Sequence, residues 1–202
     1  MKKTNKIHYM LLFLPFLLAF MPASEPVEVP KWNVDKVHST VSFTINHFFT
    51  PVAGRFTEYD IDFVFDPNDL AGSKITVVIK VNSINTGNEK RDNDLRSDNF
   101  FGAEAYPDMK FESEKIERTD ENEYLMQGKL TIKETTKDVG IPFTVLGTMD
   151  HPRREGVEII SLKSELKINR TDYEVGTGDW IRTNVVGDEI SIQFFIEANR
   201  KK

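Results

Sequence analysis

The 202-residue chain contains no cysteine and only four histidines. The absence of cysteine excludes disulfide bonds and a lipid-modified cysteine anchor, so the fold must rely on its hydrophobic core. It also removes thiolates from the available metal ligands. The histidines beyond the N-terminal segment, His38, His47 and His151, are widely spaced, and the sequence therefore predicts neither a metal site nor a cofactor.

Basic residues are fewer than acidic residues. Lys and Arg total 26 against 32 Asp and Glu, which gives a formal net charge of −6. Binding to nucleic acid needs clustered basic side chains that neutralise phosphates, so this balance excludes a general nucleic-acid binder. Catalytic patterns are equally scarce, because Ser39 and its neighbour His38 would face apart on a strand and no other serine or threonine has an evident base. An enzyme is not predicted, and a hydrolase is the least favoured function.

The chain has a single long hydrophobic run, at residues 11–20, and Pro15 interrupts it. Three lysines precede the run and the small residues of "MPAS" follow it, which is the pattern of a signal peptide. We therefore expect residues 1–23 to be a signal peptide, residues 24–31 a short linker and residues 32–202 one domain. The protein is then exported to the periplasm or outside the cell. A retained N-terminal anchor is the alternative.

Most of the remaining sequence alternates between apolar and polar residues, which indicates antiparallel strands with one apolar face. In "VSFTI", for example, Val41, Phe43 and Ile45 share one face. The same period of two appears in residues 60–66, 74–81, 128–133, 140–146, 159–169 and 189–198. The sequence therefore predicts an all-β fold in which a sandwich or a closed barrel buries the apolar faces. A barrel of about eight strands either fills with side chains or holds one slender ligand.

One stretch breaks the alternation. "NTGNEKRDNDLRSD" is rich in helix-capping residues and has no period of two, so we expect a short helical insert near residues 87–101. Leu95, Phe100 and Phe101 give this insert an apolar edge. Together with Tyr106 they are candidates for a roof over one end of a barrel.

Five segments resemble successive signatures of the YceI-like proteins: "DKVHSTVSFTINHF", "GRFTEYDIDFVFD", "SINTGNEKRDNDLRSDNFFGAEAYPDMKFES", "GKLTIKETTKDV" and "INRTDYEVG". The resemblance implies an extended, eight-stranded antiparallel lipocalin-like barrel in an exported protein. It also implies that an apolar lumen sequesters, stores or carries a polyisoprenoid or a similar long-chain amphiphilic lipid. A structural or protein-binding barrel with a filled core is the alternative.

The resemblance also suggests the ligand and the binding partners. The bound molecule is expected to be an isoprenoid lipid or a quinone-like ligand, and contact with membranes is expected to be transient. A homodimer is left open. The residues expected to line the lumen or its roof are Phe43, Ile45, Ile61, Phe63, Val77, Leu95, Phe100, Phe101, Phe111, Ile132, Phe143, Ile168 and Phe194.

Six polar residues are candidates for the barrel mouth or for contact with a head group: His38, His47, Arg91, Arg96, Arg170 and Asp172. The two histidines flank the first strand and are expected to hydrogen-bond near a barrel end. The arginine and aspartate of "NRTDY" alternate along the chain, so they are expected either to form an ion pair or to recognise a head group. The two arginines of the helical insert are expected to guide an anionic head group.

The chain departs from the family pattern at two turns. Glycine is frequent in the family where this chain has Glu134 or Thr135, and again where Glu174 follows "RTDY". Glycine tolerates backbone angles that are costly for glutamate. We therefore expect turn geometry at these two places to be a distinctive feature of this chain.

Overall fold

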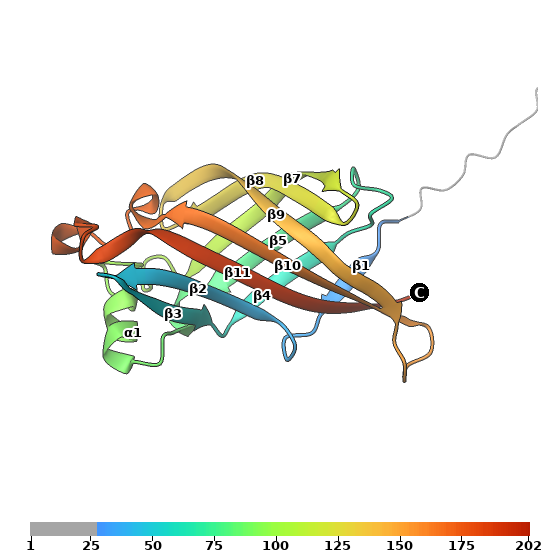
Figure 1. The fold of residues 1–202 in the computed structure, drawn as a ribbon, viewed down its shortest axis with the longest axis horizontal. Coiled ribbons are helices and arrows are strands. Elements are labelled where there is room, and N and C mark those ends of the chain that lie inside the picture. Colours follow the sequence, from blue (N-terminus) through green and yellow to red (C-terminus); the bar gives the residue numbers. More distant parts are fainter. Residues whose placement is uncertain (1–27) are drawn as a thin grey trace, which may run out of the picture.

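The computed structural model describes residues 28–202, so the predicted signal peptide and part of the predicted linker lie outside the described residues. The described chain forms an elongated barrel of antiparallel strands with a short helix at one end (Figure 1). No helix within residues 28–202 combines the length and apolar character needed to span a bilayer.

The strands are β1 (Lys31–Val34), β2 (Thr40–His47), β3 (Thr50–Phe56), β4 (Tyr59–Val64), β5 (Lys74–Lys80), β6 (Ile84–Asn85), β7 (Asp108–Asp120), β8 (Glu123–Ile132), β9 (Thr135–Asp150), β10 (Val157–Asn169) and β11 (Val186–Lys201). The helices are α1 (Glu89–Arg96) and the short 3-10 helices η1 (Val81–Ser83), η2 (Arg170–Tyr173) and η3 (Gly178–Ile181).

The strands close into a barrel of eight. β1 and β2 act as one interrupted strand because both pair with β11, and β3 and β4 form a second interrupted strand that pairs with the first. β5, β7, β8, β9, β10 and β11 then follow in sequence order, each antiparallel to its neighbour. Closure pairs the strand edges that an open sheet would expose. The predicted eight-stranded antiparallel barrel is thereby confirmed.

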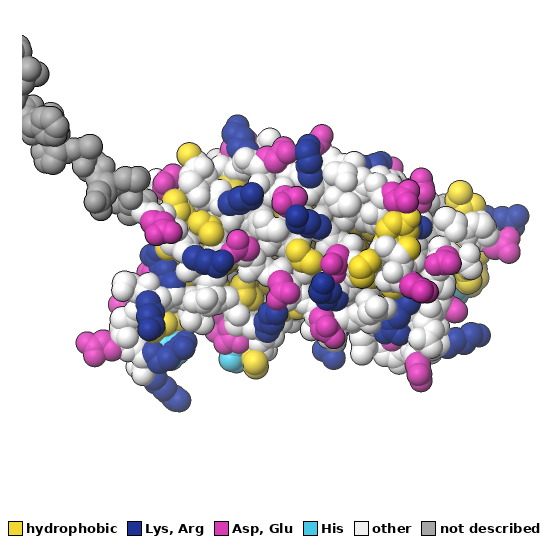
Figure 2. Space-filling model, turned by 180° about the vertical axis from the view of Figure 1, so that it is seen from behind, with side chains coloured by type: hydrophobic (Ala, Val, Ile, Leu, Met, Phe, Trp, Pro, Cys, Tyr) yellow, Lys and Arg dark blue, Asp and Glu magenta, His cyan; other side chains and the backbone are white. Residues whose placement is uncertain are grey.

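Alternation along the strands separates the inside of the barrel from the outside. On β10, Leu162, Ser164 and Leu166 are buried, whereas the intervening Lys163 and Glu165 are exposed. The outer face carries basic and acidic side chains next to one another (Figure 2), and several pair across neighbouring strands. Such exposed ion pairs add little stability. The apolar faces therefore hold the barrel together from within.

The interior contains two hydrophobic cores. The closed-end core consists of Trp32, Phe63, Phe65, Ile75, Phe111, Ile116, Tyr124, Met126, Ile141, Phe143, Ile160, Leu162, Leu166, Ile196 and Ala198. The helix-end core consists of Val41, Phe56, Tyr59, Val81, Ile84, Phe100, Phe101, Ala103, Met109, Ile132, Tyr173 and Val175. In the closed-end core the rings of Phe65, Tyr124 and Phe143 pack against one another with centroids 5.0, 5.3 and 5.6 Å apart. That part of the barrel is therefore solidly packed.

Helix α1 is the predicted insert, and it covers one end of the barrel (Figure 1). It begins where Asn88 Oδ1 accepts the N–H of Arg91 at 3.0 Å, a standard N-cap that satisfies a free helical donor. The buried carboxylate of Asp92 accepts the N–H and hydroxyl of Thr86, at 2.9 and 2.5 Å. The helix is thus tied through Asp92 to the chain that leaves β6.

Candidate functional site: an apolar cavity open at the helix end

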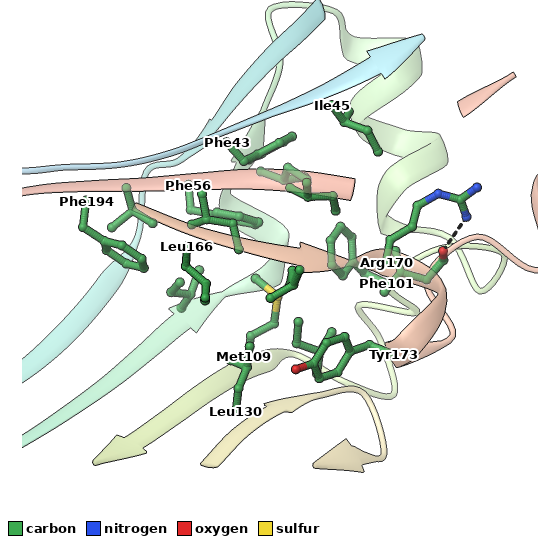
Figure 3. A pocket seen from close by; sticks show the side chains of 18 of the residues that line it. Phe43, Ile45, Phe56, Phe101, Met109, Leu130, Leu166, Arg170, Tyr173 and Phe194 are labelled. Atoms are coloured by element: carbon green, nitrogen blue, oxygen red, sulfur yellow. Dashed lines mark hydrogen bonds between the residues drawn. The ribbon is translucent and has the colours of Figure 1, made fainter. Parts of the chain in front are cut away.

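A cavity of about 480 Å³ lies inside the barrel and reaches the end that carries α1. Four of its lining side chains, Ile61, Leu130, Ile168 and Phe194, pack against both cores yet stay only partly buried. Side chains that point inward in a closed barrel and still retain accessible surface must border unfilled space. Figure 3 shows such side chains, among them Phe43 and Phe194, directed into a common interior. The two cores therefore do not meet, and the space between them is the candidate binding site.

The structure places all the apolar candidate residues on the cavity wall. They are Phe43, Ile45, Ile61, Phe63, Val77, Leu95, Phe100, Phe101, Phe111, Ile132, Phe143, Ile168 and Phe194. Their surroundings differ, because Phe63, Phe111 and Phe143 also belong to the closed-end core and are at most 4% exposed. Phe43 and Phe194 are only half-buried, with rings that border the open space. The first group forms the floor of the cavity and the second group its side walls.

Further lining residues were not among those predicted to line the lumen. They include Val41, Phe56, Ile79, Met109, Leu130, Leu166, Ile190 and Ile192. Most of them lie two residues from a predicted lining residue on the same strand, so the period of two already indicated them.

Tyr106 was expected in the roof, but it does not line the cavity: its hydroxyl donates to Glu134 Oε1 at 2.6 Å on the surface. This hydrogen bond to a carboxylate raises the pKa of Tyr106.

Polar side chains gather where the cavity reaches α1. They are Asn46, His47, Thr86, Asn88, Lys90, Arg91 and Asp94. Arg91 is held in place, because its Nε donates to Thr86 Oγ1 at 2.7 Å and its Nη2 to the Thr86 carbonyl at 2.8 Å. Lys90 is exposed and makes no ion pair within the described part of the chain. The cavity mouth therefore combines an apolar interior with a polar rim that contains two cations.

Arg170 is the most unusual charged residue of the site, because its side chain is almost fully buried at 2% exposure. Its Nε donates to the carbonyl of Gly187 at 2.8 Å. Its two terminal nitrogens donate to four further carbonyls, those of Val175, Gly176, Trp180 and Val186. A guanidinium has five N–H donors, so every donor is engaged by the chain itself. Burial lowers the pKa of Arg170, and the nearby Asp188 carboxylate partly opposes that effect.

These contacts give Arg170 a different role from the expected one. The ion pair between Arg170 and Asp172 does not form; Asp172 pairs with Lys137 at 2.9 Å outside the cavity. The reason is local, since both residues lie in η2, where the alternation of a strand no longer applies. Arg170 instead fastens residues 175–187 at the cavity end, with one of these hydrogen bonds drawn in Figure 3, and it retains no N–H for a head group.

The other polar candidates divide between the two ends of the barrel. His47 and Arg91 line the cavity mouth. Arg96 does not, because it donates to the carbonyls of Asn82 and Ile84. His38 lies at the opposite end of β2, in the turn after β1, where its Nδ1 is 3.0 Å from Asp35 Oδ2. Sequence reasoning could not separate these positions, since both histidines simply flank one strand.

His38, Asp35 and Glu197 form a compact group away from the cavity. Their ligand-type atoms all lie within 4.8 Å of one another. The Asp35 carboxylate raises the pKa of His38 through a hydrogen bond and direct attraction, and Glu197 adds to the effect. The same hydrogen bond lowers the pKa of Asp35. The group lies on the surface and brings the β1–β2 turn next to Glu197 of β11.

Comparisons with known proteins agree with this architecture. The family model described as "YceI-like domain" matches residues 32–198. A UPF0312 protein of Staphylococcus epidermidis is 35% identical over 157 residues, which cover 77% of this chain and 88% of that protein. The crystal structure of Burkholderia cenocepacia BcnA superposes with a TM-score of 0.74 at 30% identity, over 82% of this chain and 99% of that one. A polyisoprenoid binding domain from Saccharophagus degradans has a TM-score of 0.62 at 16% identity, over 83% of this chain and 97% of that one, and it shares the fold.

Proposed function

The chain belongs to the YceI-like family, and from that premise we propose that its barrel is an exported carrier for a long-chain lipid. The apolar tail occupies the cavity between the two cores, and the polar head group stays at the mouth beside α1. A polyisoprenoid is the tail chemistry that we favour, with a quinone-like isoprenoid as a variant of the same class. No bond-breaking step is part of the proposal.

The observation that carries this proposal is the cavity itself. A volume of about 480 Å³ falls within the range of pockets that hold small organic ligands, roughly 300–1,000 Å³. Its wall is built almost entirely from aliphatic and aromatic side chains, so it offers a tail burial but few hydrogen bonds. Polar side chains are concentrated at the mouth, where Lys90 and Arg91 suit a head group that carries negative charge or oxygen acceptors.

The chemistry of the wall favours a carrier over a hydrolase. Hydrolysis needs a nucleophile next to a base. Ser164 is a hydroxyl on the wall, but it donates to the Pro142 carbonyl at 2.7 Å, which leaves it without a base among the described residues. The alternative of a filled structural barrel is disfavoured by the partly buried Ile61, Leu130, Ile168 and Phe194, which would be fully covered in a packed core.

The carrier is proposed to work reversibly. A bilayer solvates an apolar tail about as well as an apolar lumen does, so the hydrophobic contribution to the free energy nearly cancels when a lipid moves between them. Selectivity must then come from how well the tail fills the cavity and from contacts at the mouth. Export follows from the signal-peptide pattern of residues 1–23, and the mass of the protein recovered from its own host tests whether cleavage occurs after Ala23.

Binding can be tested with Trp180, which lines the cavity and packs on Phe100 with ring centroids 5.4 Å apart. Delipidated protein is titrated with isoprenoid alcohols of graded length, a quinone with an isoprenoid tail and a straight-chain fatty acid, and tryptophan fluorescence is recorded. We expect saturable changes whose affinity peaks at one tail length. Trp180→Phe serves as the control, because Trp32 is buried in the closed-end core away from the cavity. Native mass spectrometry of protein from its own host then identifies the bound lipid. A protein that binds none of these molecules and carries no lipid contradicts the proposal.

A further inference from the structure

Two phenylalanines lie exposed at the cavity mouth. Phe49 is 98% exposed and Phe48 is 57% exposed, at the turn that joins β2 to β3. Ile181, at the end of η3, is 62% exposed. We propose that these three side chains, the docking tip, insert into the surface of a lipid bilayer and place the cavity mouth against it. This inference rests on the proposed function, since it names the surface from which the carrier takes its lipid.

The turn that carries Phe48 and Phe49 directly follows strands that line the cavity. Ile45 on β2 and Val52 on β3 line the cavity, and Phe48 and Phe49 lie directly beyond them at the turn. The backbone N–H of Phe48 donates to the Val185 carbonyl at 2.8 Å, which ties this turn to the loop that follows η3. The same two strands therefore carry the apolar wall inside the barrel and the exposed rings at its mouth, with the rim residues Asn46 and His47 between them. Hydrophobic side chains are visible at this end of the molecule in Figure 2, opposite the grey trace.

The conformation of Phe48 supports a role outside the fold. Its φ of 51° is in the left-handed region, which is uncommon for a bulky aromatic residue. The ring of His47 packs edge-on against that of Phe48, with centroids 4.5 Å apart. This local arrangement holds the Phe48 ring on the surface rather than in a core. Glycine or asparagine would satisfy the same turn with less strain and without exposing an aromatic ring.

A bilayer is the occupant that fits the docking tip best. Residues 46–52 carry no acidic or basic side chain except His47, so they can enter the interfacial layer without burying a fixed charge. Lys90 lines the cavity mouth and Arg182 follows Ile181 in the chain, and both side chains are exposed and able to contact the phosphates of lipid head groups. Three side chains are far fewer than the roughly 20–30 residues that each partner contributes to a stable protein interface. Insertion of two rings suits a transient membrane contact, as a reversible carrier needs.

The test compares Phe49→Ser with a matched control. Phe49 is almost fully exposed, so its replacement leaves the packing of the barrel unchanged. Val37→Ser is the control, because Val37 is 86% exposed but lies in the turn at the other end of β2. Three quantities are measured: flotation of the protein with phosphatidylcholine vesicles, the rate of isoprenoid transfer out of those vesicles, and equilibrium uptake of the same isoprenoid added from ethanol without vesicles.

We expect Phe49→Ser to lower both vesicle binding and the transfer rate by about tenfold or more, which corresponds to one ring no longer buried. Equilibrium uptake without vesicles should be unchanged, and Val37→Ser should resemble the wild type in all three measurements. Phe49→Trp should restore docking, and its fluorescence should shift to the blue when vesicles are added. Phosphatidylcholine carries no net charge, so Lys90 and Arg182 should add little net attraction, and raising the salt concentration should change vesicle binding little.

The outcomes separate this inference from the proposed function. Equal transfer rates for Phe49→Ser and Val37→Ser, with uptake intact, overturn the docking tip and leave the carrier standing. Absence of uptake in the wild type overturns the carrier itself. If Phe49→Ser abolishes self-association of the protein and the wild type does not float with vesicles, the three side chains form a contact between two copies and the membrane proposal is wrong.

Discussion

The ring of Phe43 lies across the backbone of Gly54, its direct partner on the neighbouring strand β3. A methyl group at Gly54 would overlap the end of that ring. Because Phe43 lines the cavity, the absence of a side chain at Gly54 keeps this ring against the wall and the adjacent space open. One glycine thus contributes to the width of the cavity near its mouth.

We therefore expect Gly54→Ala to push the Phe43 ring into the cavity. Overpacking should lower the free energy of unfolding by about 1–3 kcal/mol, and the preferred tail length in the isoprenoid titration should become shorter. Gly147→Ala is the control, because a methyl group there would meet nothing within 4 Å. An unchanged tail preference in Gly54→Ala would show that Phe43 does not limit the space available to the ligand.

The floor and the side walls of the cavity should respond differently to truncation. Phe143 stacks on Tyr124 and packs on Phe65, so Phe143→Ala should cost the lipid-free protein about 3–5 kcal/mol. Phe194 borders open space, and Phe194→Ala should cost the lipid-free protein clearly less while weakening lipid binding more. Denaturant unfolding with and without lipid measures both effects. Equal losses in the lipid-free state would indicate a filled barrel.

Arg170 should control the segment that crosses the cavity end. Arg170→Met removes the donors of five hydrogen bonds to backbone carbonyls and leaves several of those carbonyls unpaired. Each unpaired buried group costs about 1–3 kcal/mol. We expect faster hydrogen exchange and easier proteolysis in residues 175–187, with the strands of the closed end little affected. If exchange rises evenly over the whole barrel, Arg170 stabilises the fold in general and is not a local clamp.

The turn after η2 should become more stable when its strain is relieved. Glu174 has a φ of 56°, and Lys133, whose Nζ donates to the Glu174 carbonyl at 3.0 Å, has a φ of 54°. Glycine has no Cβ and adopts left-handed angles without strain, but it also increases the conformational entropy of the unfolded chain. The net result of these two effects should be that Glu174→Gly stabilises the protein by about 1 kcal/mol. Glu174→Ala keeps the strain and should not stabilise. Thermal unfolding of the two variants distinguishes them.

Much of the fold could be predicted because apolar and polar residues alternate along a strand with a period of two. The long strands β9, β10 and β11 and the inward direction of Phe43, Ile61 and Phe194 follow from that period, whereas a cavity instead of a filled core was predicted only from the family resemblance. β1 was not predicted because four residues are too few to show alternation. β3 was not predicted because "TPVAGRF" contains proline and glycine, which usually mark loops. Its glycine is tolerated because the Phe43 ring covers it.

The polar part of the site was harder to predict because it depends on where the strands stop. "NRTDY" looks like the continuation of β10, but the chain leaves the strand at Asn169 and η2 turns Arg170 inward. The turn geometry was flagged near Glu134 and at Glu174, and the structure has left-handed residues at Lys133 and at Glu174. The docking tip could not be predicted from periodicity, because Phe48 and Phe49 are adjacent residues in a turn and do not alternate with polar residues.

The last prediction concerns the pH dependence of the ion pair between His38 and Asp35. Asp35 raises the pKa of His38 above its ordinary value of 6.5, and His38 lowers the pKa of Asp35 below its ordinary value of 3.8. A raised histidine pKa stabilises the fold fully below the pKa of the unfolded state, and this contribution disappears as the pH rises through the folded pKa. A lowered aspartate pKa contributes above the unfolded value and is lost as the pH falls through the folded one. The pair should therefore stabilise the protein from about pH 4 to about pH 6.

His38→Gln should remove this part of the pH dependence, so the difference in unfolding free energy between wild type and variant should be largest in that window and fall toward alkaline pH. NMR titration of the His38 ring should show a pKa above 6.5 in the wild type and a lower one in Asp35→Asn. Because the ring is on the surface, the difference in stability should shrink as salt is added. A His38 pKa that stays the same in Asp35→Asn would mean that Glu197, 3.8 Å away, supplies the attraction instead.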